Sequence, residues 1–242
     1  MKKSTMKKII YNGIFVLLLA VALVMIFNRP IKNTVIDSYK PKITRQAIVK
    51  AQRHVKNATN HHRRQPVSYN FKKVKSLDFQ TAVAARMNTR TIQPAGQILI
   101  PQSGIHLPIG LGVANQTLAL AAGTMRPDQR MGHGNYPLAG HHMVNPKILF
   151  GPLYYKTKVG QQIYLTDMKR VYQYRVYRRT FIAATRVDVI NQTKRPIVTL
   201  VTCDATGKGR LMIRGRLVAQ YRLNAATPKI KRAFLRPANN LS

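Results

Sequence analysis

Three hydrophobic patterns follow one another along this chain of 242 residues, beginning with an uncharged and mostly apolar stretch at residues 9–28. Twenty helical residues span about 30 Å, which matches the hydrocarbon core of a bilayer. The stretch therefore predicts a transmembrane anchor. A cleaved signal peptide is the alternative, but Asn28, Arg29 and Pro30 follow the apolar run where a small-x-small cleavage motif would be needed.

The second pattern covers residues 29–74 and predicts a basic stalk. Apolar side chains recur at helical spacing between Ile43 and Val55, and lysines and arginines lie between them. This pattern favours a solvated, partly helical linker, and a helix lying on anionic lipid is the alternative.

The third pattern begins near residue 75, where short runs rich in β-branched and apolar residues are separated by turn residues. Short helices are predicted over residues 78–87 and 116–122. Strands are predicted at residues 97–101, 105–109, 162–166, 171–177, 197–203 and 210–217. Many short strands with few helices predict an all-β fold, closed or nearly closed into a barrel, over residues 75–224. Residues 225–242 are expected to form a basic C-terminal tail.

The single cysteine of the chain, Cys203, ends the β-branched run at residues 197–203. A short turn-rich connection leads to Arg210 on the return strand, so a hairpin would place both side chains on one face. A guanidinium beside a thiol favours the reactive thiolate and stabilises a developing oxyanion. These features suggest a cysteine nucleophile. The alternative is a small buried core residue, which is the commonest environment of a free cysteine.

The charge balance is strongly basic, with 41 lysines and arginines against six acidic residues, all aspartate, and a formal net charge of +35. Such a surface attracts polyanions, whether nucleic acid, anionic lipid or an acidic wall polymer. Four lysines within residues 1–8 precede the apolar stretch and favour a cytoplasmic N-terminus. The bulk of the chain is then expected outside the cell, where an unpaired cysteine is a candidate reactive thiol.

A cysteine nucleophile needs a proton-transfer partner, and this partner is usually a histidine. The best candidates are His141 and His142, at the end of an apolar stretch that closes on Ala139 and Gly140.

Together, these residues resemble the sortase family of Gram-positive bacteria. The resemblance rests on Ala139-Gly140-His141, on the T-L-V-T-C strand at residues 199–203, and on Arg210 in the next strand. Supporting segments lie at residues 97–101, 120–125 and 135–141, all in the family's order and behind an N-terminal anchor. The match covers about residues 75–224.

The resemblance implies a sortase-type eight-stranded closed β-barrel with short helices, preceded by one transmembrane helix. It implies a cysteine transpeptidase that cuts an L-P-x-T-G sorting signal between Thr and Gly through a thioester. By position, Cys203 is then the nucleophile, His141 the general acid and base, and Arg210 the stabiliser of substrate and oxyanion. The Leu-Pro part of the signal is expected to bind Ala139, Val187, Val189, Ile190 and Val201.

The subclass implied is the housekeeping class A, because no second apolar span follows the barrel and the segment before the cysteine strand is short. The domains expected are a cytoplasmic tail (1–8), the anchor (9–28), the stalk (29–74), the catalytic barrel (75–224) and the tail (225–242).

Expected partners are surface proteins bearing the signal, a lipid-linked peptidoglycan precursor that supplies the acceptor amine, the membrane and anionic wall polymers, but not nucleic acid. We expect no cofactor and no calcium dependence, since calcium needs several carboxylates and the aspartates are scattered. Two alternatives remain open. One is a membrane-tethered basic module that binds anionic wall polymer, and the other is a different peptidoglycan-directed cysteine transpeptidase.

Overall fold

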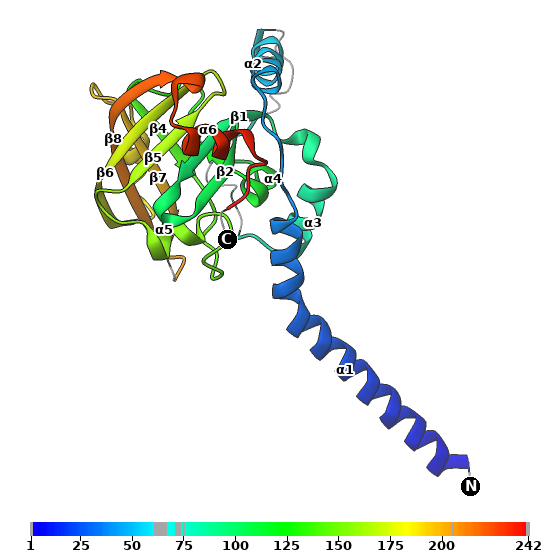
Figure 1. The fold of residues 1–242 in the computed structure, drawn as a ribbon. Helices are drawn as coiled ribbons and strands as arrows, with labels where there is room; N and C mark the ends of the chain where they lie inside the picture. The colour runs from blue at the N-terminus through cyan, green and yellow to red at the C-terminus, as the bar shows by residue number, and fades with distance from the viewer. Residues whose placement is uncertain (1, 61–66, 71–73, 75, 205, 241–242) are drawn as a thin grey trace.

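The computed structural model describes residues 2–60, 67–70, 74, 76–204 and 206–240. Its most prominent feature outside the barrel is the long helix α1 (Lys2–Asp37), which projects away from the body of the molecule (Figure 1). The helix from Ile10 to Asp37 is long and apolar enough to cross a membrane. Its most apolar window has a mean hydropathy of 2.6, and none of that window is buried. These properties fit the predicted membrane anchor.

Eight strands close into a barrel in the order β1-β2-β3-β4-β7-β8-β6-β5. Neighbouring strands pair antiparallel except β2 with β3 and β4 with β7, which pair parallel. The strands are β1 (Pro94–Ile100), β2 (Ile105–Gly110), β3 (Ala122–Thr124), β4 (Asn135–Ala139), β5 (Gln162–Thr166), β6 (Arg170–Ala183), β7 (Ile197–Cys203) and β8 (Gly209–Arg222). The predicted eight-stranded closed barrel is confirmed.

Short helices connect and flank the strands. They are α2 (Arg45–Asn60), α3 (Phe79–Met87), α4 (Asn115–Leu120), α5 (Gly151–Lys156), α6 (Pro228–Leu235) and the single-turn 3₁₀ helices η2 (Thr89–Thr91), η3 (Pro101–Ser103), η4 (Val187–Ile190) and η5 (Leu223–Ala225). Asp78 caps α3 by accepting a hydrogen bond from the Thr81 amide at 2.7 Å, which fixes where this helix begins.

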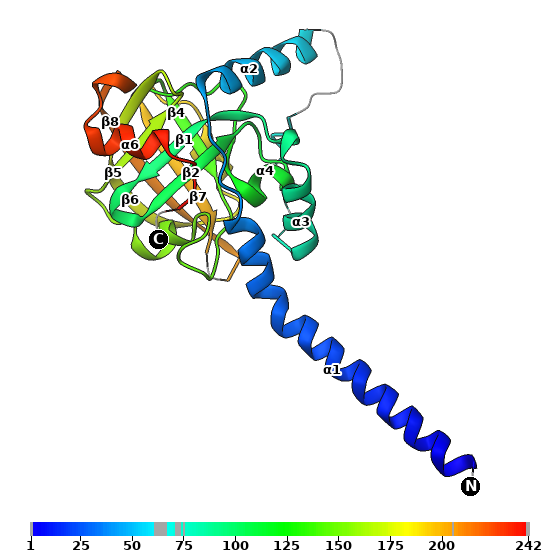
Figure 2. The same ribbon diagram turned by 45° about the vertical axis from the view of Figure 1, so that its right-hand side comes forward.

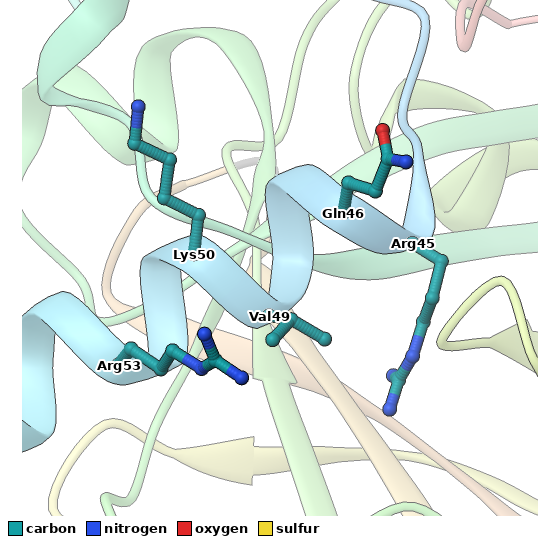
Figure 3. A pocket seen from close by; sticks show the side chains of 5 residues that line it. All are labelled: Arg45, Gln46, Val49, Lys50 and Arg53. Carbon is teal, nitrogen blue, oxygen red and sulfur yellow. The ribbon is translucent and has the colours of Figure 1, made fainter.

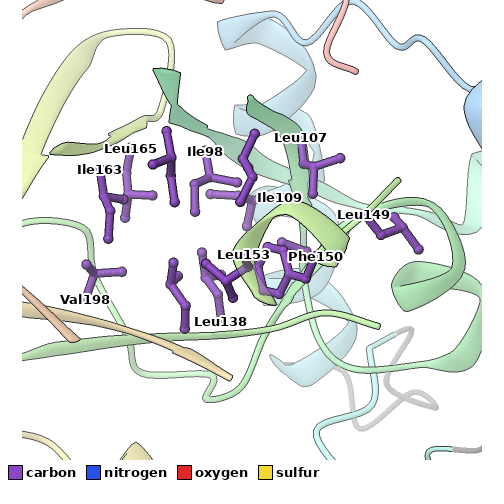
Figure 4. Packing of buried hydrophobic residues seen from close by; sticks show 14 of the residues in the cluster. Ile98, Leu107, Ile109, Leu138, Leu149, Phe150, Leu153, Ile163, Leu165 and Val198 are labelled. Atoms are coloured by element: carbon purple, nitrogen blue, oxygen red, sulfur yellow. The ribbon is translucent and has the colours of Figure 1, made fainter. Parts of the chain in front are cut away.

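The barrel interior is an aliphatic core built from alternate residues of each strand, as the two-residue period of a strand requires. Figure 4 shows these side chains meeting between the strands and α5. Leu138, Ile163 and Leu200 are fully buried within it. Removing a side chain of this size from water stabilises the fold by about 1.5–3 kcal/mol, so the interior face of each strand has little freedom to vary.

The segments on either side of the barrel sequence also pack against it. Ile36 near the end of α1 belongs to the main core, and Ile48 of α2 is fully buried. At the other end of the chain, Ile230 and Phe234 of α6 are buried against β1 and β6. Figure 2 shows α2 beginning beside the barrel and extending outward from it, at the end of the molecule away from the free end of α1. The domain boundaries stay predictions, but the expected stalk and tail both contribute buried side chains.

Candidate active site

Cys203 and Arg210 face each other beside the turn that connects β7 to β8. They are directly opposed residues of the antiparallel ladder, and each side chain is partly exposed. Asp204 shapes the turn because its carboxylate accepts hydrogen bonds from the amides of Thr206 at 3.0 Å and Gly209 at 2.9 Å. The predicted hairpin is therefore present, with the thiol and the guanidinium at its tip.

The guanidinium of Arg210 is held by the turn beside it. Its Nη1 donates hydrogen bonds to the backbone oxygens of Gly207 at 3.0 Å and Gly209 at 2.8 Å. Fixing one nitrogen in this way restricts where the planar group can lie, close to the end of β7.

His141 reaches the same end of the sheet through a parallel strand pair. Ala139 at the end of β4 is level with Val201 of β7, and the Gly140 amide donates to the Val201 oxygen at 3.1 Å. His141 comes directly after Gly140, just beyond the end of β4, and Cys203 ends the neighbouring strand β7. The structure thus opposes Cys203 and Arg210 directly and places His141 just beyond the end of the strand that pairs with β7, and the catalytic roles stay predictions.

Gly140 is needed where the chain leaves β4. A Cβ at this position would lie only 2.5–2.9 Å from three atoms of the Phe150 ring, closer than packed atoms tolerate. The amide of Phe150 in turn donates to the backbone oxygen of His141 at 3.2 Å. Close packing against Phe150 is the physical reason for the small residue before the histidine.

The imidazole of His141 is 9% exposed, and its Nε2 is buried with no hydrogen-bond partner among the described residues. Burial lowers the pKa of His141 to about 4, and the positive charge of Lys32 acts in the same direction. Lys32 lies on α1, where its Nζ donates to the Leu77 oxygen at 3.0 Å. At neutral pH the ring is therefore uncharged and able to accept a proton.

His142 has a different environment, packed on two tyrosines of α5. Its ring lies 4.5 Å from that of Tyr154 in an edge-to-face arrangement and 5.7 Å from that of Tyr155. Burial lowers its pKa, and the charge of Asp204 opposes this shift. Aromatic contacts of this kind give His142 a packing role, which leaves His141 as the better candidate for proton transfer.

A second buried hydrophobic cluster packs on the outer side of the barrel wall, next to the end where Cys203 and Arg210 lie. Four of the five residues predicted to bind the Leu-Pro part of a signal lie together in it or against it, namely Ala139, Val189, Ile190 and Val201. The fifth, Val187, is 70% exposed on η4 and lies outside the cluster. We name this buried cluster the apolar patch, with Val113, Leu118, Met125 and Met212 as its other members.

Sequence reasoning missed Met212, although a signal for it exists. Met212 is two residues after Arg210 on the same strand, so the alternation of β8 places both side chains on one face. Leu118 and Met125 approach from α4 and from the end of β3, and no local pattern links those segments to Cys203.

An open cavity lies elsewhere, on the exposed surface of α2. It has a volume of about 370 Å³ and is lined by one helix alone, as Figure 3 shows, with Arg45, Gln46, Val49, Lys50 and Arg53. It contains no nucleophile and no acid, so it does not compete with the hairpin tip as a catalytic centre. Within the described part of the chain, no three His, Cys, Asp or Glu side chains cluster to hold a metal ion. The expectation of no metal stays a prediction.

Comparison with known proteins agrees with this geometry. Residues 98–218 match the family described as the sortase domain. The chain is 33% identical to a sortase A of Streptococcus agalactiae, over 94% of this chain and 92% of that protein. It is 35% identical to a sortase A of Listeria monocytogenes, over 79% of this chain and 83% of that one.

A solved structure of sortase A from Listeria monocytogenes superposes with a TM-score of 0.55 and 38% identity, covering 59% of this chain and 97% of that one. The family match covers half of the chain, the two relatives align with most of it, and the solved structure shares its barrel, so all three comparisons indicate the same family. The chain belongs to the sortase family of cell-wall transpeptidases.

Proposed function

We propose that this protein is a class A sortase that cleaves an L-P-x-T-G signal between Thr and Gly and joins the threonine to an amine of a peptidoglycan precursor. The observation that carries the proposal is the opposed pair of Cys203 and Arg210 at the end of β7 and β8, with His141 just beyond the end of the neighbouring strand β4. The similarity to two sortase A proteins supports the class.

The first half-reaction uses His141 as a base and then as an acid. The neutral imidazole takes the thiol proton of Cys203 while Sγ attacks the threonine carbonyl carbon. Arg210 stabilises the negative charge that develops on the carbonyl oxygen. The imidazolium then protonates the departing glycine nitrogen, the C–N bond breaks, and a thioester remains. A buried imidazolium whose pKa is held near 4 is a strong acid for this step.

The second half-reaction uses the same ring for the acceptor. His141 takes a proton from the incoming amine as the nitrogen attacks the thioester carbonyl. The C–S bond then breaks, and the proton passes from the imidazolium to the leaving thiolate of Cys203. One imidazole therefore serves both halves, because both amines occupy the same place in turn.

The position of α1 supports a lipid-linked acceptor. Lys32, whose charge acts on His141, follows the predicted anchor by only four residues, which is about 6 Å of helix. The catalytic end of the barrel therefore lies close to the proposed membrane surface, where the amine of a lipid-linked precursor would be found. We propose an N-terminus in the cytoplasm and the barrel outside, from the lysines that precede the apolar stretch.

The test is to incubate the full chain, in nonionic detergent, with a labelled L-P-x-T-G peptide and a small primary amine. We expect mass spectrometry to find the peptide cut after Thr and joined to the amine, and the Cys203→Ala variant to yield neither product. A folded protein that binds anionic wall polymer but leaves the peptide intact would instead support the basic binding module.

A further inference from the structure

A cationic pocket lies on the same face of β8 as the catalytic arginine, farther along the strand. Alternate residues Arg210, Met212, Arg214 and Arg216 point outward, whereas Leu211, Ile213 and Gly215 point into the barrel. Met212 belongs to the apolar patch, so the outward row runs from the catalytic end, across that patch, to two further arginines.

The pocket has a volume of about 290 Å³, and its lining combines a hydroxyl, an aromatic ring and four cations. The guanidinium of Arg216 lies over the Tyr177 ring, 5.1 Å from its centre. Arg214 donates from Nη2 to the Val189 oxygen at 3.2 Å, and its Nε is buried without a partner among the described residues. The lining residues are Tyr177, Thr193, Lys194, Arg195, Ile197, Arg214 and Arg216.

The positive charge of this pocket has little compensation within the protein. Arg216 lies directly opposite Arg175, and Arg214 directly opposite Arg178, across the β6–β8 ladder. Like charges at opposed positions destabilise a sheet. Asp188 is the acid that feels the charge of Arg214, but both of its oxygens are held by Arg186, at 2.7 and 2.9 Å.

None of the ion pairs formed by the described residues includes a cation of the pocket. An arrangement that costs stability and leaves four cations around a cavity is suited to an anion supplied from outside.

The distances along β8 indicate which part of an extended substrate would supply the anion. A strand rises about 3.3 Å per residue, so Arg214 lies about 13 Å and Arg216 about 20 Å from Arg210. An extended signal with its Thr at Cys203 has its Leu about 10 Å away, within the apolar patch. The three residues that precede the Leu then fall about 13–20 Å from the catalytic end, level with the pocket.

We propose that the cationic pocket binds acidic side chains of the surface protein immediately before the sorting signal. This inference rests on the proposed function, because that function sets the position of the Thr. We favour a peptide over a phosphate polymer as the occupant. Arg214 lines the pocket and also donates to the backbone oxygen of Val189, a member of the apolar patch, so it connects the pocket to the predicted site of the Leu-Pro residues. A substrate seated in the patch and continuing along β8 must pass this arginine.

The test compares peptides that share one L-P-x-T-G signal and differ only in the three preceding residues, which are all aspartate, all serine or all lysine. With the full chain in nonionic detergent, we expect kcat/KM to rise roughly three- to tenfold from serine to aspartate, the size expected of two or three exposed ion pairs, and to fall with lysine. The gain should shrink at high salt, because exposed charges are screened. A peptide with no preceding residues gives the reference rate.

The matched variants are Arg216→Gln and Arg222→Gln, which remove the same charge from exposed positions of β8, one in the pocket and one beyond it. We expect Arg216→Gln to lose most of the aspartate advantage while cleaving the reference peptide at the normal rate, and Arg222→Gln to keep it. Equal cleavage of all three peptides by the unmodified chain would overturn the inference and leave the proposed function intact.

Failure to cleave even the reference peptide would overturn the proposed function itself, and the inference with it. Binding of inorganic polyphosphate tests the alternative occupant, an anionic polymer. If it binds in a way that needs Arg216 while aspartate gives no advantage, the pocket belongs to an anionic polymer and the inference is wrong.

Discussion

The two faces of β7 and β8 are built for different purposes. The inward face carries Val198, Leu200 and Ile213, all fully buried in the main core. The outward face of the same strands carries Cys203 and Arg210 and then an apolar patch and a row of arginines. Because side chains alternate along a strand, each residue of the catalytic face has neighbours that serve the core.

This comparison teaches that stability and activity should respond separately to substitution. Changes to the inward face should unfold the barrel and leave the chemistry of each folded molecule intact. Changes to the outward face should remove activity at little cost to the fold.

Cys203→Ala should abolish transpeptidation, because no other thiol exists in the chain. The midpoint of thermal unfolding should hardly move, since the thiol is small and partly exposed. Turnover by the purified variant would exclude Cys203 as the nucleophile. Loss of folding would instead support the interpretation of Cys203 as a buried core residue.

His141→Ala should lower kcat/KM by about 10²–10⁴-fold, the usual contribution of general acid–base catalysis. His142→Ala is the matched control from the adjacent position and should cost far less, because its ring packs on Tyr154 and Tyr155. Steady-state kinetics on one peptide would compare the two variants. A larger loss in His142→Ala than in His141→Ala would assign the proton transfer to His142.

Leu200→Ala tests the inward face. It should lower the free energy of unfolding by about 2–5 kcal/mol, as expected when a fully buried leucine leaves a cavity. Denaturant titration measures this loss. The rate per folded molecule, obtained at low temperature where the variant is native, should stay near normal, and a large fall in that rate would show that the two faces are not separate.

Arg210→Lys should reduce kcat/KM by roughly ten- to a hundredfold, the size expected when a hydrogen bond to a charged group is lost. Lysine keeps the charge but has a single nitrogen, whereas in arginine Nη1 binds two loop carbonyls and leaves the other guanidinium nitrogens for the substrate. Near-normal kinetics for the lysine variant would reduce Arg210 to a general electrostatic role.

Lys32→Met should move the acid limb of the kcat/KM profile upward by up to about one pH unit. His141 acts when neutral, and burial together with the charge of Lys32 lowers its pKa to about 4, so removing the charge raises the pH below which the ring is protonated. Lys32→Arg keeps the charge and is the control. An unchanged limb in Lys32→Met would show that burial alone sets the pKa.

Initial rates should be compared with folding over the same pH range. His106 is also buried and has its pKa lowered to about 4. Both neutral imidazoles stabilise the folded state above pH 6.5, their ordinary pKa, and this stabilisation is lost as the pH falls through about 4. The acid limb therefore has meaning only where circular dichroism shows a native barrel.

The sequence by itself determined the features whose signal is local. The absence of charge over residues 9–28 predicts a membrane-spanning length. Period-two alternation predicts the strands β5 and β6, and a run of β-branched residues predicts β7. One cysteine, one turn and one arginine at hairpin spacing predict the opposed pair of Cys203 and Arg210. These predictions need only the geometry of a strand or a helix, which is the same in every protein.

Only the tertiary structure decided the features that depend on residues far apart in the chain. The charge that acts on His141 comes from Lys32, 109 positions earlier, and the docking of α2 and α6 hides apolar faces that the sequence alone presents as parts of basic segments. The pocket combines β6, β8 and the loop before β7. No local pattern encodes such meetings, because closing the barrel sets which distant side chains become neighbours.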